Sequence, residues 1–293
     1  MPDKAYLLMP GAAGILYTVS QFWLKRAFEL GVGPWRSAFI ANWASALIFM
    51  PLAFLWPDGS FWTGWGPAIG ASAALFAGQL LAFLAIERGD VSVVAPMMGT
   101  KVVGVVLLSV LFFHQGFGSD VWIAAILTSV AVAMLQWAPP HDRHRVLRTV
   151  LLSGAAAMSF ALCDVIIQRW CRDAGFFVYG AKLYMLCALF SFGLIPFFHG
   201  RLKDIRKDSF ILLGMGVGAL CVQGFLMYAS IGYFQDAAGS NIVYNLRGIW
   251  SILLIQFLSQ HFKTDEGSAG RAVMTRRFVG AALMVASVAL IVT

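Results

Sequence analysis

Charged residues are scarce in this chain, and their scarcity excludes a soluble globular protein. Only 12% of the 293 residues are charged and 60% are hydrophobic, whereas soluble domains average about 25% charged and 45–50% apolar residues. The mean hydropathy is +0.78. The composition therefore predicts an integral membrane protein in which the lipid bilayer is the main surrounding partner.

Acidic residues are the rarer of the two signs. The chain has 14 Asp and Glu against 21 Lys and Arg, a formal net charge of +7. A basic chain can bind nucleic acid when its cations form one patch, but here they lie in loops between apolar runs. The positive-inside rule for membrane proteins explains that placement better, so we expect no nucleic-acid partner.

Metal-binding and catalytic clusters are also missing from the sequence. The four cysteines mostly lie in apolar segments without metal-ligand spacing, and the five histidines lie in loops or at segment ends. A membrane-embedded lipid-handling enzyme would need a nucleophile, a metal cluster or a carboxylate pair. We therefore expect that the protein has no cofactor and is not an enzyme. A membrane-embedded lipid-handling enzyme stays as the alternative from another functional class.

Long apolar segments are abundant instead. About 17–25 mostly apolar residues form a helix that crosses a bilayer, and the segments lack the alternating pattern of barrel strands. The predicted fold class is an all-α integral membrane protein with ten transmembrane helices. The predicted spans are 5–24, 36–56, 65–87, 91–113, 120–138, 149–170, 177–199, 209–234, 238–261 and 277–293.

The second half of the chain repeats features of the first. The apolar segments 91–113 and 238–261 each contain one central cation, Lys101 and Arg247, which lie 146 residues apart. Gln79 and Gln223 match at a spacing of 144 residues. A charge near the bilayer centre is unfavourable by roughly 2.5–3.5 kcal/mol on insertion scales, so matching cations indicate a retained polar site.

This repetition predicts two five-helix repeats, residues 1–140 and 141–293, in one membrane domain. Because five is odd, the second repeat must enter the membrane from the opposite side and form an inverted pair. Secondary transporters commonly have inverted repeats with the substrate site at the interface between them. Segments 120–138 and 277–293 present almost no polar residues and are expected at the periphery.

Loop charges predict an orientation. The loops after odd-numbered segments contain 15 basic residues, and the opposite side contains 3. The positive-inside rule then places the odd loops in the cytoplasm and both termini outside.

Three segments give the chain a family resemblance. They are G-I-L-Y-T-V-S-Q-F-W-L-K-R-A at 14–27, V-V-A-P-M-M-G-T-K-V-V at 93–103 and Y-N-L-R-G-I-W-S at 244–251. With the two repeats, they make the whole chain resemble the drug/metabolite transporter superfamily, EamA type. The resemblance implies a multi-pass transporter in the inner (cytoplasmic) membrane that exports amino acids, other metabolites or drugs.

The chain departs from this family in two respects. Such proteins often have a glutamate just after the fourth span, where this chain has His114-Gln115-Gly116, so no role of that acid is carried over. The family's termini are commonly drawn in the cytoplasm, against the loop charges. The sequence therefore leaves the orientation of the termini undecided.

Polar residues at helical spacing identify the residues that line the predicted cavity. Lipid-facing polar groups would lack partners, so polar stripes should face protein or water. The predicted substrate-binding residues are Lys101, Arg247, Tyr244, Asn245, Gln79, Gln223, Tyr17, Ser20, Asn241 and Ser251. Asp164 in the sixth span is the candidate for an ion pair or for proton coupling.

Packing is an alternative explanation for some of these residues. Gln79 and Gln223 could form hydrogen bonds between helices, and Ser20 and Ser251 could bond to their own backbone. Asp164 could be a static partner of Lys101 or Arg247, or of Gln168 and Arg169 nearby.

The balance of charge in the spans indicates the substrate. Two deep cations face one deep acid, Asp164, and a buried unpaired charge is strongly unfavourable. An anionic ligand would compensate it, and the forked side chain of arginine suits carboxylate or phosphate. The sequence thus predicts a secondary-active transporter of a small anionic metabolite, acting by alternating access as a monomer or loose dimer. A neutral or zwitterionic substrate, such as an exported amino acid or drug, and a structural role for both cations stay open.

Overall fold

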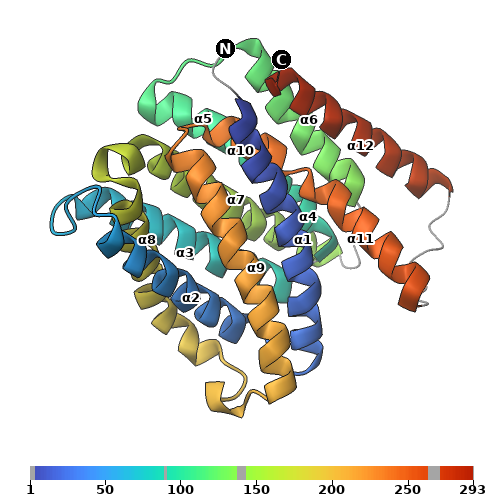
Figure 1. Cartoon of the computed structure of the whole chain (residues 1–293). Helices are drawn as coiled ribbons and strands as arrows, with labels where there is room; N and C mark the ends of the chain where they lie inside the picture. The colour runs from blue at the N-terminus through green and yellow to red at the C-terminus, as the bar shows by residue number, and fades with distance from the viewer. Residues whose placement is uncertain (1–3, 89–90, 137–142, 263–270, 293) are drawn as a thin grey trace.

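The computed structural model describes residues 4–88, 91–136, 143–262 and 271–292, and it is a bundle of helices (Figure 1). The described part contains helices and no strands, as predicted from the apolar segments. The elements are η1 (Lys4–Leu7), α1 (Leu8–Glu29), α2 (Pro34–Leu55), α3 (Trp65–Arg88), α4 (Val91–Gly99), α5 (Lys101–Phe113), α6 (Ser119–Gln136), α7 (Arg143–Ala174), α8 (Phe176–Phe190), η2 (Ser191–Phe197), η3 (Leu202–Asp204), α9 (Lys207–Gly232), α10 (Ala237–Tyr244), α11 (Arg247–Phe262) and α12 (Arg271–Val292).

Nine spans in the described residues are long and apolar enough to cross a membrane. The fourth of them, Pro96–Phe113, combines parts of α4 and α5. The predicted ninth span, 238–261, is instead divided into α10 and α11 at Asn245 and Leu246. The predicted class, an all-α multi-pass membrane protein, is confirmed.

The outer surface of the bundle is apolar. Leu47, Phe54 and Phe278 are 69%, 69% and 77% exposed. A soluble protein rarely exposes large contiguous apolar patches, whereas lipid chains cover such side chains without loss. The exposed surface therefore agrees with a protein that lies in a bilayer.

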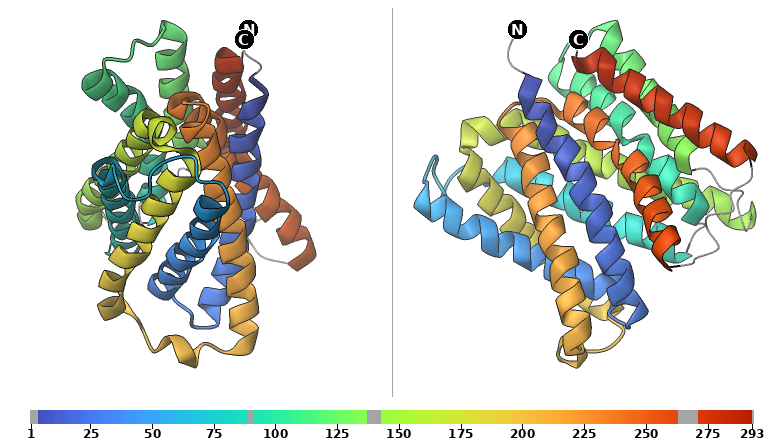
Figure 2. Two further views of the ribbon diagram at one scale, coloured as in Figure 1. Left: turned by 60° about the vertical axis from the view of Figure 1, so that its left-hand side comes forward. Right: turned by 45° about the vertical axis from the view of Figure 1, so that its right-hand side comes forward.

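Helices from the two halves of the chain pack against each other. The main pairs are α1 with α9, α3 with α7, α2 with α8 and α6 with α12 (Figures 1 and 2). Exchanging the halves, so that α1 takes the place of α7 and α3 that of α9, converts the first pair into the second. The other two pairs are converted into themselves. This exchange supports the predicted repeats.

The equivalent helices α2 and α8 begin in the same way. Gly33 and Gly175 precede them with φ of 74° and 89°, a conformation that glycine adopts without steric cost. These two glycines are 142 residues apart. The structure therefore shifts the register at this point from the spacing of 144 that the sequence comparison gives.

The helices α2 and α8 run antiparallel, as an inverted pair requires. Near the start of α2, the Arg36 guanidinium donates to the carbonyl of Arg201, beyond the end of α8, at 3.3 Å. Just after α2, the Asp58 carboxylate accepts the backbone N–H groups of Phe177 and Val178 at 2.9 and 3.2 Å. The boundary between the repeats lies in 137–142, outside the described residues, so the predicted division at residue 140 stays a prediction.

Both ends of the chain lie at the same end of the bundle (Figure 1). Lys4 Nζ donates to the carbonyl of Ile291 at 2.6 Å, and Tyr6 donates its hydroxyl to Asp236 just before α10 at 2.6 Å. We call this end the termini side. The far side is the opposite end, where Arg36 and Arg201 meet.

Candidate functional site

Interrupted helices place the two deep cations at equivalent positions. Lys101 is the first residue of α5, and Arg247 is the first residue of α11. The preceding turns are tightened by i→i−3 hydrogen bonds, from Thr100 N to Met97 O at 3.1 Å and from Leu246 N to Val243 O at 3.0 Å. Tightened turns inside helices often mark hinges, and interrupted helices form the midplane sites of secondary transporters.

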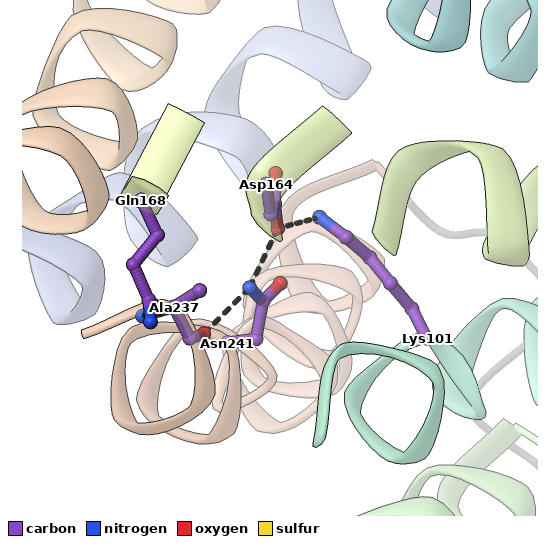
Figure 3. A network of polar contacts seen from close by, with 5 residues as sticks. All are labelled: Lys101, Asp164, Gln168, Ala237 and Asn241. Carbon is purple, nitrogen blue, oxygen red and sulfur yellow. Dashed lines mark hydrogen bonds and ion pairs between the residues drawn. The ribbon is translucent and has the colours of Figure 1, made fainter. Parts of the chain in front are cut away.

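Lys101 is paired with Asp164. Its Nζ lies 2.7 Å from Oδ2 of Asp164 on α7, and the two side chains are only 17% and 11% exposed. The same oxygen accepts a hydrogen bond from Asn241 Nδ2 on α10 at 2.7 Å (Figure 3). The ion pair is therefore one of the alternatives that the sequence leaves open for Asp164, with Lys101 as its partner.

Arg247 keeps its positive charge without a carboxylate. Among the described residues, no Asp or Glu lies within ion-pair distance of its guanidinium. The guanidinium carbon lies 4.8 Å from the ring centroid of Tyr17 and 4.5 Å from that of Tyr244. These rings meet edge to face with centroids 6.0 Å apart. Cation–π contacts stabilise a cation without neutralising it.

The different partners of the two cations follow from one sequence difference between the repeats. Ser20 stands at the position of the first half that corresponds to Asp164, 144 residues earlier. Its hydroxyl donates to the Tyr17 carbonyl on its own helix at 2.7 Å, which is the packing alternative for this serine. The second repeat therefore supplies a carboxylate to the first cation, and the first repeat supplies none to the second.

A glycine allows α1 to approach the interruption between α10 and α11. A Cβ atom added at Gly14 would lie 3.1 Å from the Tyr244 carbonyl oxygen and 3.3 Å from the Arg247 nitrogen. Thr18, one turn further along α1, donates its hydroxyl to the Gly14 carbonyl at 3.0 Å. The small residue at position 14 thus brings Tyr17 against the guanidinium.

A chain of hydrogen bonds leads from Asp164 toward the termini side. Asn241 also donates to the Ala237 carbonyl at 2.8 Å. The Ala237 N–H donates to Oε1 of Gln168 at 2.7 Å, and Gln168 Nε2 donates to Oε1 of Gln115 at 2.7 Å. Gln168 is absent from the predicted site. Its position one helical turn after Asp164 is the sequence signal that could have identified it.

In the described part of the chain, no side-chain hydrogen bond or ion pair joins the remaining predicted residues to the polar residues around the two deep cations. Gln79 and Asn42 exchange amide hydrogen bonds at 3.0 and 3.2 Å between α3 and α2, as in the packing alternative. Ser251 donates to the Gly248 carbonyl of its own helix at 2.8 Å. Gln223 is partly buried on α9 and Asn245 is buried where α10 ends. Their predicted roles in binding stay predictions.

Lys182 has a place that the sequence did not indicate. Its position near a predicted span end favours an amine that reaches the lipid headgroups, but the side chain is 1% exposed. Nζ donates to the carbonyls of Ser60 and Thr63 at 2.7 and 2.6 Å. The loop after α2 folds over the start of α8 and supplies these acceptors, so Lys182 joins the two halves.

In the part of the chain that the structure describes, no group of three His, Cys, Asp or Glu residues could hold a metal ion. The polar residues of the site are instead amides, hydroxyls and one neutralised ion pair around one uncompensated cation. Such a set can bind and release a polar solute by hydrogen bonds and charge.

The fold and the site define a multi-pass membrane protein with inverted, interrupted helices, the architecture of secondary transporters. Residues 4–137 match the EamA-like transporter family. The resemblance to EamA-type transporters of the drug/metabolite transporter superfamily is thereby confirmed over the first predicted repeat.

Solved structures extend the fold comparison to the whole chain. Twenty-nine solved chains match. One of them, described only as a crystal structure of a protein, is 15% identical with a TM-score of 0.74, over 98% of this chain and 96% of that one. At this identity the likeness shows the fold alone. No curated protein matches the sequence.

Proposed function

We propose that the protein is a secondary-active transporter in the inner (cytoplasmic) membrane that carries a small polar metabolite with an anionic group by alternating access. The family match over residues 4–137 supports transport. The observation that carries the anionic substrate is the Arg247 guanidinium, which lies at a helix interruption without a carboxylate partner.

The charges of the site favour one anionic group. The Lys101–Asp164 pair is neutral as a unit, so Arg247 accounts for the net positive charge among the three. Desolvating an unpaired cation is costly, and a carboxylate or phosphate could accept two parallel hydrogen bonds from its fork. The geometry thus supports Arg247 as the anion ligand, while Lys101 already has Asp164 as its partner.

Alternating access is supported by a difference between equivalent helix contacts. Near the termini side, α7 packs against α9. The equivalent pair, α1 with α3, makes at most marginal contact in the described residues. Two similar repeats in unlike arrangements can exchange those arrangements, and the exchange would move access from the far side to the termini side.

Asp164 offers a route for proton coupling. Its Oδ2 accepts from both Lys101 and Asn241, so it links α7 with α5 and α10. Protonation would remove its charge, weaken both contacts and leave Lys101 without a counter-ion. A proton taken up from one side could therefore favour the arrangement in which these helices separate.

Uptake into proteoliposomes tests the proposal. The panel contains labelled carboxylates, phosphate monoesters, zwitterionic amino acids and neutral sugars, and it is applied to the wild type, Arg247→Ala and Arg247→Lys. We expect uptake of one or more anionic members. Arg247→Ala should abolish it, and Arg247→Lys should reduce it because an amine lacks the fork.

A cation outside the membrane provides the control. Arg206 lies just before α9 with a side chain that is 75% exposed, so Arg206→Ala should leave uptake unchanged. Equal uptake of anions by wild type and Arg247→Ala would refute the assignment of Arg247. Uptake limited to zwitterionic or neutral members would favour an exporter of amino acids or drugs.

A further inference from the structure

We propose that Gln168 is the positioning residue of a polar gate on the termini side, and that the gate on the far side is apolar. This inference rests on the alternating access proposed above. It assigns to Gln168 the task of holding α7 against the start of α10 while the termini side is closed.

Gln168 joins three separate parts of the chain. Its side chain accepts the Ala237 N–H at 2.7 Å and donates to Gln115, which follows α5, at 2.7 Å. Its backbone carbonyl accepts a weaker hydrogen bond from Gln235 at 3.4 Å. Figure 3 shows Gln168 and Asp164 approaching α10 from the same helix, with Ala237 and Asn241 opposite them.

These contacts join two helices that otherwise pack mainly on other elements. α7 packs mainly on α3, α4 and α5, whereas α10 packs on α1, α5, α6 and α9 and only slightly on α7. Asp164–Asn241 and Gln168–Ala237 are hydrogen bonds from α7 to α10. Separation of α7 from α10 on this side would break both.

The bond to Ala237 also completes a helix start. The first N–H groups of a helix have no partner within it. The Asp236 carboxylate caps α10 by accepting from Gly239 N at 2.8 Å, and Gln168 satisfies the Ala237 N–H. Opening would expose that N–H to water, which could replace the lost acceptor. The gate can therefore open without leaving an unsatisfied donor, provided that water enters.

The far side has no such residues at the equivalent positions. Leu24 corresponds to Gln168, and Val91 and Ala95 correspond to Ala237 and Asn241. Leu24 is 5% exposed and packs against α9, where a Cβ atom at Gly216 would meet it at 2.8 Å. The side chains of Leu24 and Ala95 cannot form hydrogen bonds, and Ser20, which corresponds to Asp164, donates to the Tyr17 carbonyl of its own helix. Closure of the far side would therefore use apolar contact, which excludes water, and the two gates would differ in chemistry.

Distance measurements between spin labels test the gate directly. Labels are attached to Gly116→Cys and Tyr233→Cys, two exposed positions on either side of Gln168, in the full chain in lipid nanodiscs. The four native cysteines are buried, which directs labelling to the added residues. Gln168→Leu keeps similar bulk and removes both side-chain hydrogen bonds.

We expect Gln168→Leu to raise the ratio of long to short label distances about threefold, as the loss of one interhelical hydrogen bond of average strength in membranes predicts, because only the bond to Ala237 joins α7 to α10. Gln115→Leu keeps that bond and removes the one that orients the Gln168 amide, so it should give a smaller shift in the same direction. Gln79→Leu is the matched control, because it breaks an amide pair between α3 and α2 away from this side. It should leave the distances unchanged.

Unchanged distances in both Gln168→Leu and Gln115→Leu would overturn the gate, and so would an equal shift in Gln79→Leu. The measurement needs neither substrate nor flux. A shift in distances without uptake of any solute would therefore reject the proposed function and keep the gate, and uptake without a shift would do the reverse.

Discussion

Breaking the buried Lys101–Asp164 pair should destabilise the protein far more than breaking an ion pair that is exposed to water. At the observed 2.7 Å, Coulomb attraction amounts to about 6 kcal/mol at an effective dielectric constant of about 20. Part of that attraction offsets desolvation, and loss of one partner from a buried pair typically costs about 3–5 kcal/mol. Lys101→Met leaves Asp164 with Asn241 alone, and Asp164→Asn leaves the amine unpaired.

Thermal unfolding of the purified protein measures this cost. At roughly 2 °C per kcal/mol for a chain of this size, each single variant should melt about 6 °C or more below the wild type. The double variant Lys101→Met/Asp164→Asn has no unpaired charge and should regain most of the loss. Asn241 keeps its bond to the Ala237 carbonyl in all of them.

An exposed ion pair is the control for this change in melting temperature. Arg169 and Asp173 lie 3.1 Å apart, but their side chains are 52% and 66% exposed. Solvent screening reduces such pairs to about 0–1 kcal/mol, so Arg169→Met should change the melting temperature by about 2 °C at most. Additive losses in the Lys101–Asp164 double variant, or single variants that melt like Arg169→Met, would refute the reasoning.

Three further predictions concern contacts between helices. Gly14→Val should lower the transport rate, because the valine side chain would push α1 away from the interruption before Arg247. Gly11→Ala is the control, since its Cβ would lie at an ordinary 3.8 Å from Val243. Equal transport rates of the two variants in flux assays would contradict the prediction. Lys182→Met should lower the free energy of unfolding by about 2–3 kcal/mol, since two charge-assisted hydrogen bonds are lost. Chemical denaturation measures this change, and a wild-type value would exclude a stabilising link from Lys182 to the 60–63 loop. Gln79→Leu should lower stability and leave the substrate KM unchanged if its amide pair only packs helices; a raised KM would restore its predicted role in binding.

Hydropathy was sufficient to predict the spanning helices, because lipid contact demands long apolar runs. The edges were less predictable. α7 spans Arg143–Ala174 where the apolar run suggests 149–170, since a helix continues into the headgroup region without needing apolar side chains. The helix interruption at Asn245 could not be predicted, because the residue there is neither proline nor glycine.

The partners of the site residues could be identified only from the three-dimensional structure. Charge counting predicted that either Lys101 or Arg247 would lack an acid, and of these two Arg247 is the cation without a carboxylate partner in the described residues. Only the packing of α7 against α5 shows that Asp164 takes Lys101. Gln79 and Lys182 have partners far away in the sequence, Asn42 and the 60–63 loop, and one sequence contains no pattern that links them.

The most direct test compares the metabolites released by cells that express the wild type with those released by cells that express Arg247→Ala at the same level. Untargeted mass spectrometry inside and outside the cells measures the redistribution. The account predicts that the solutes moved by the wild type carry a carboxylate or phosphate group and that Arg247→Ala does not move them. Redistribution of neutral solutes only, or the same anions moved by both proteins, would contradict it.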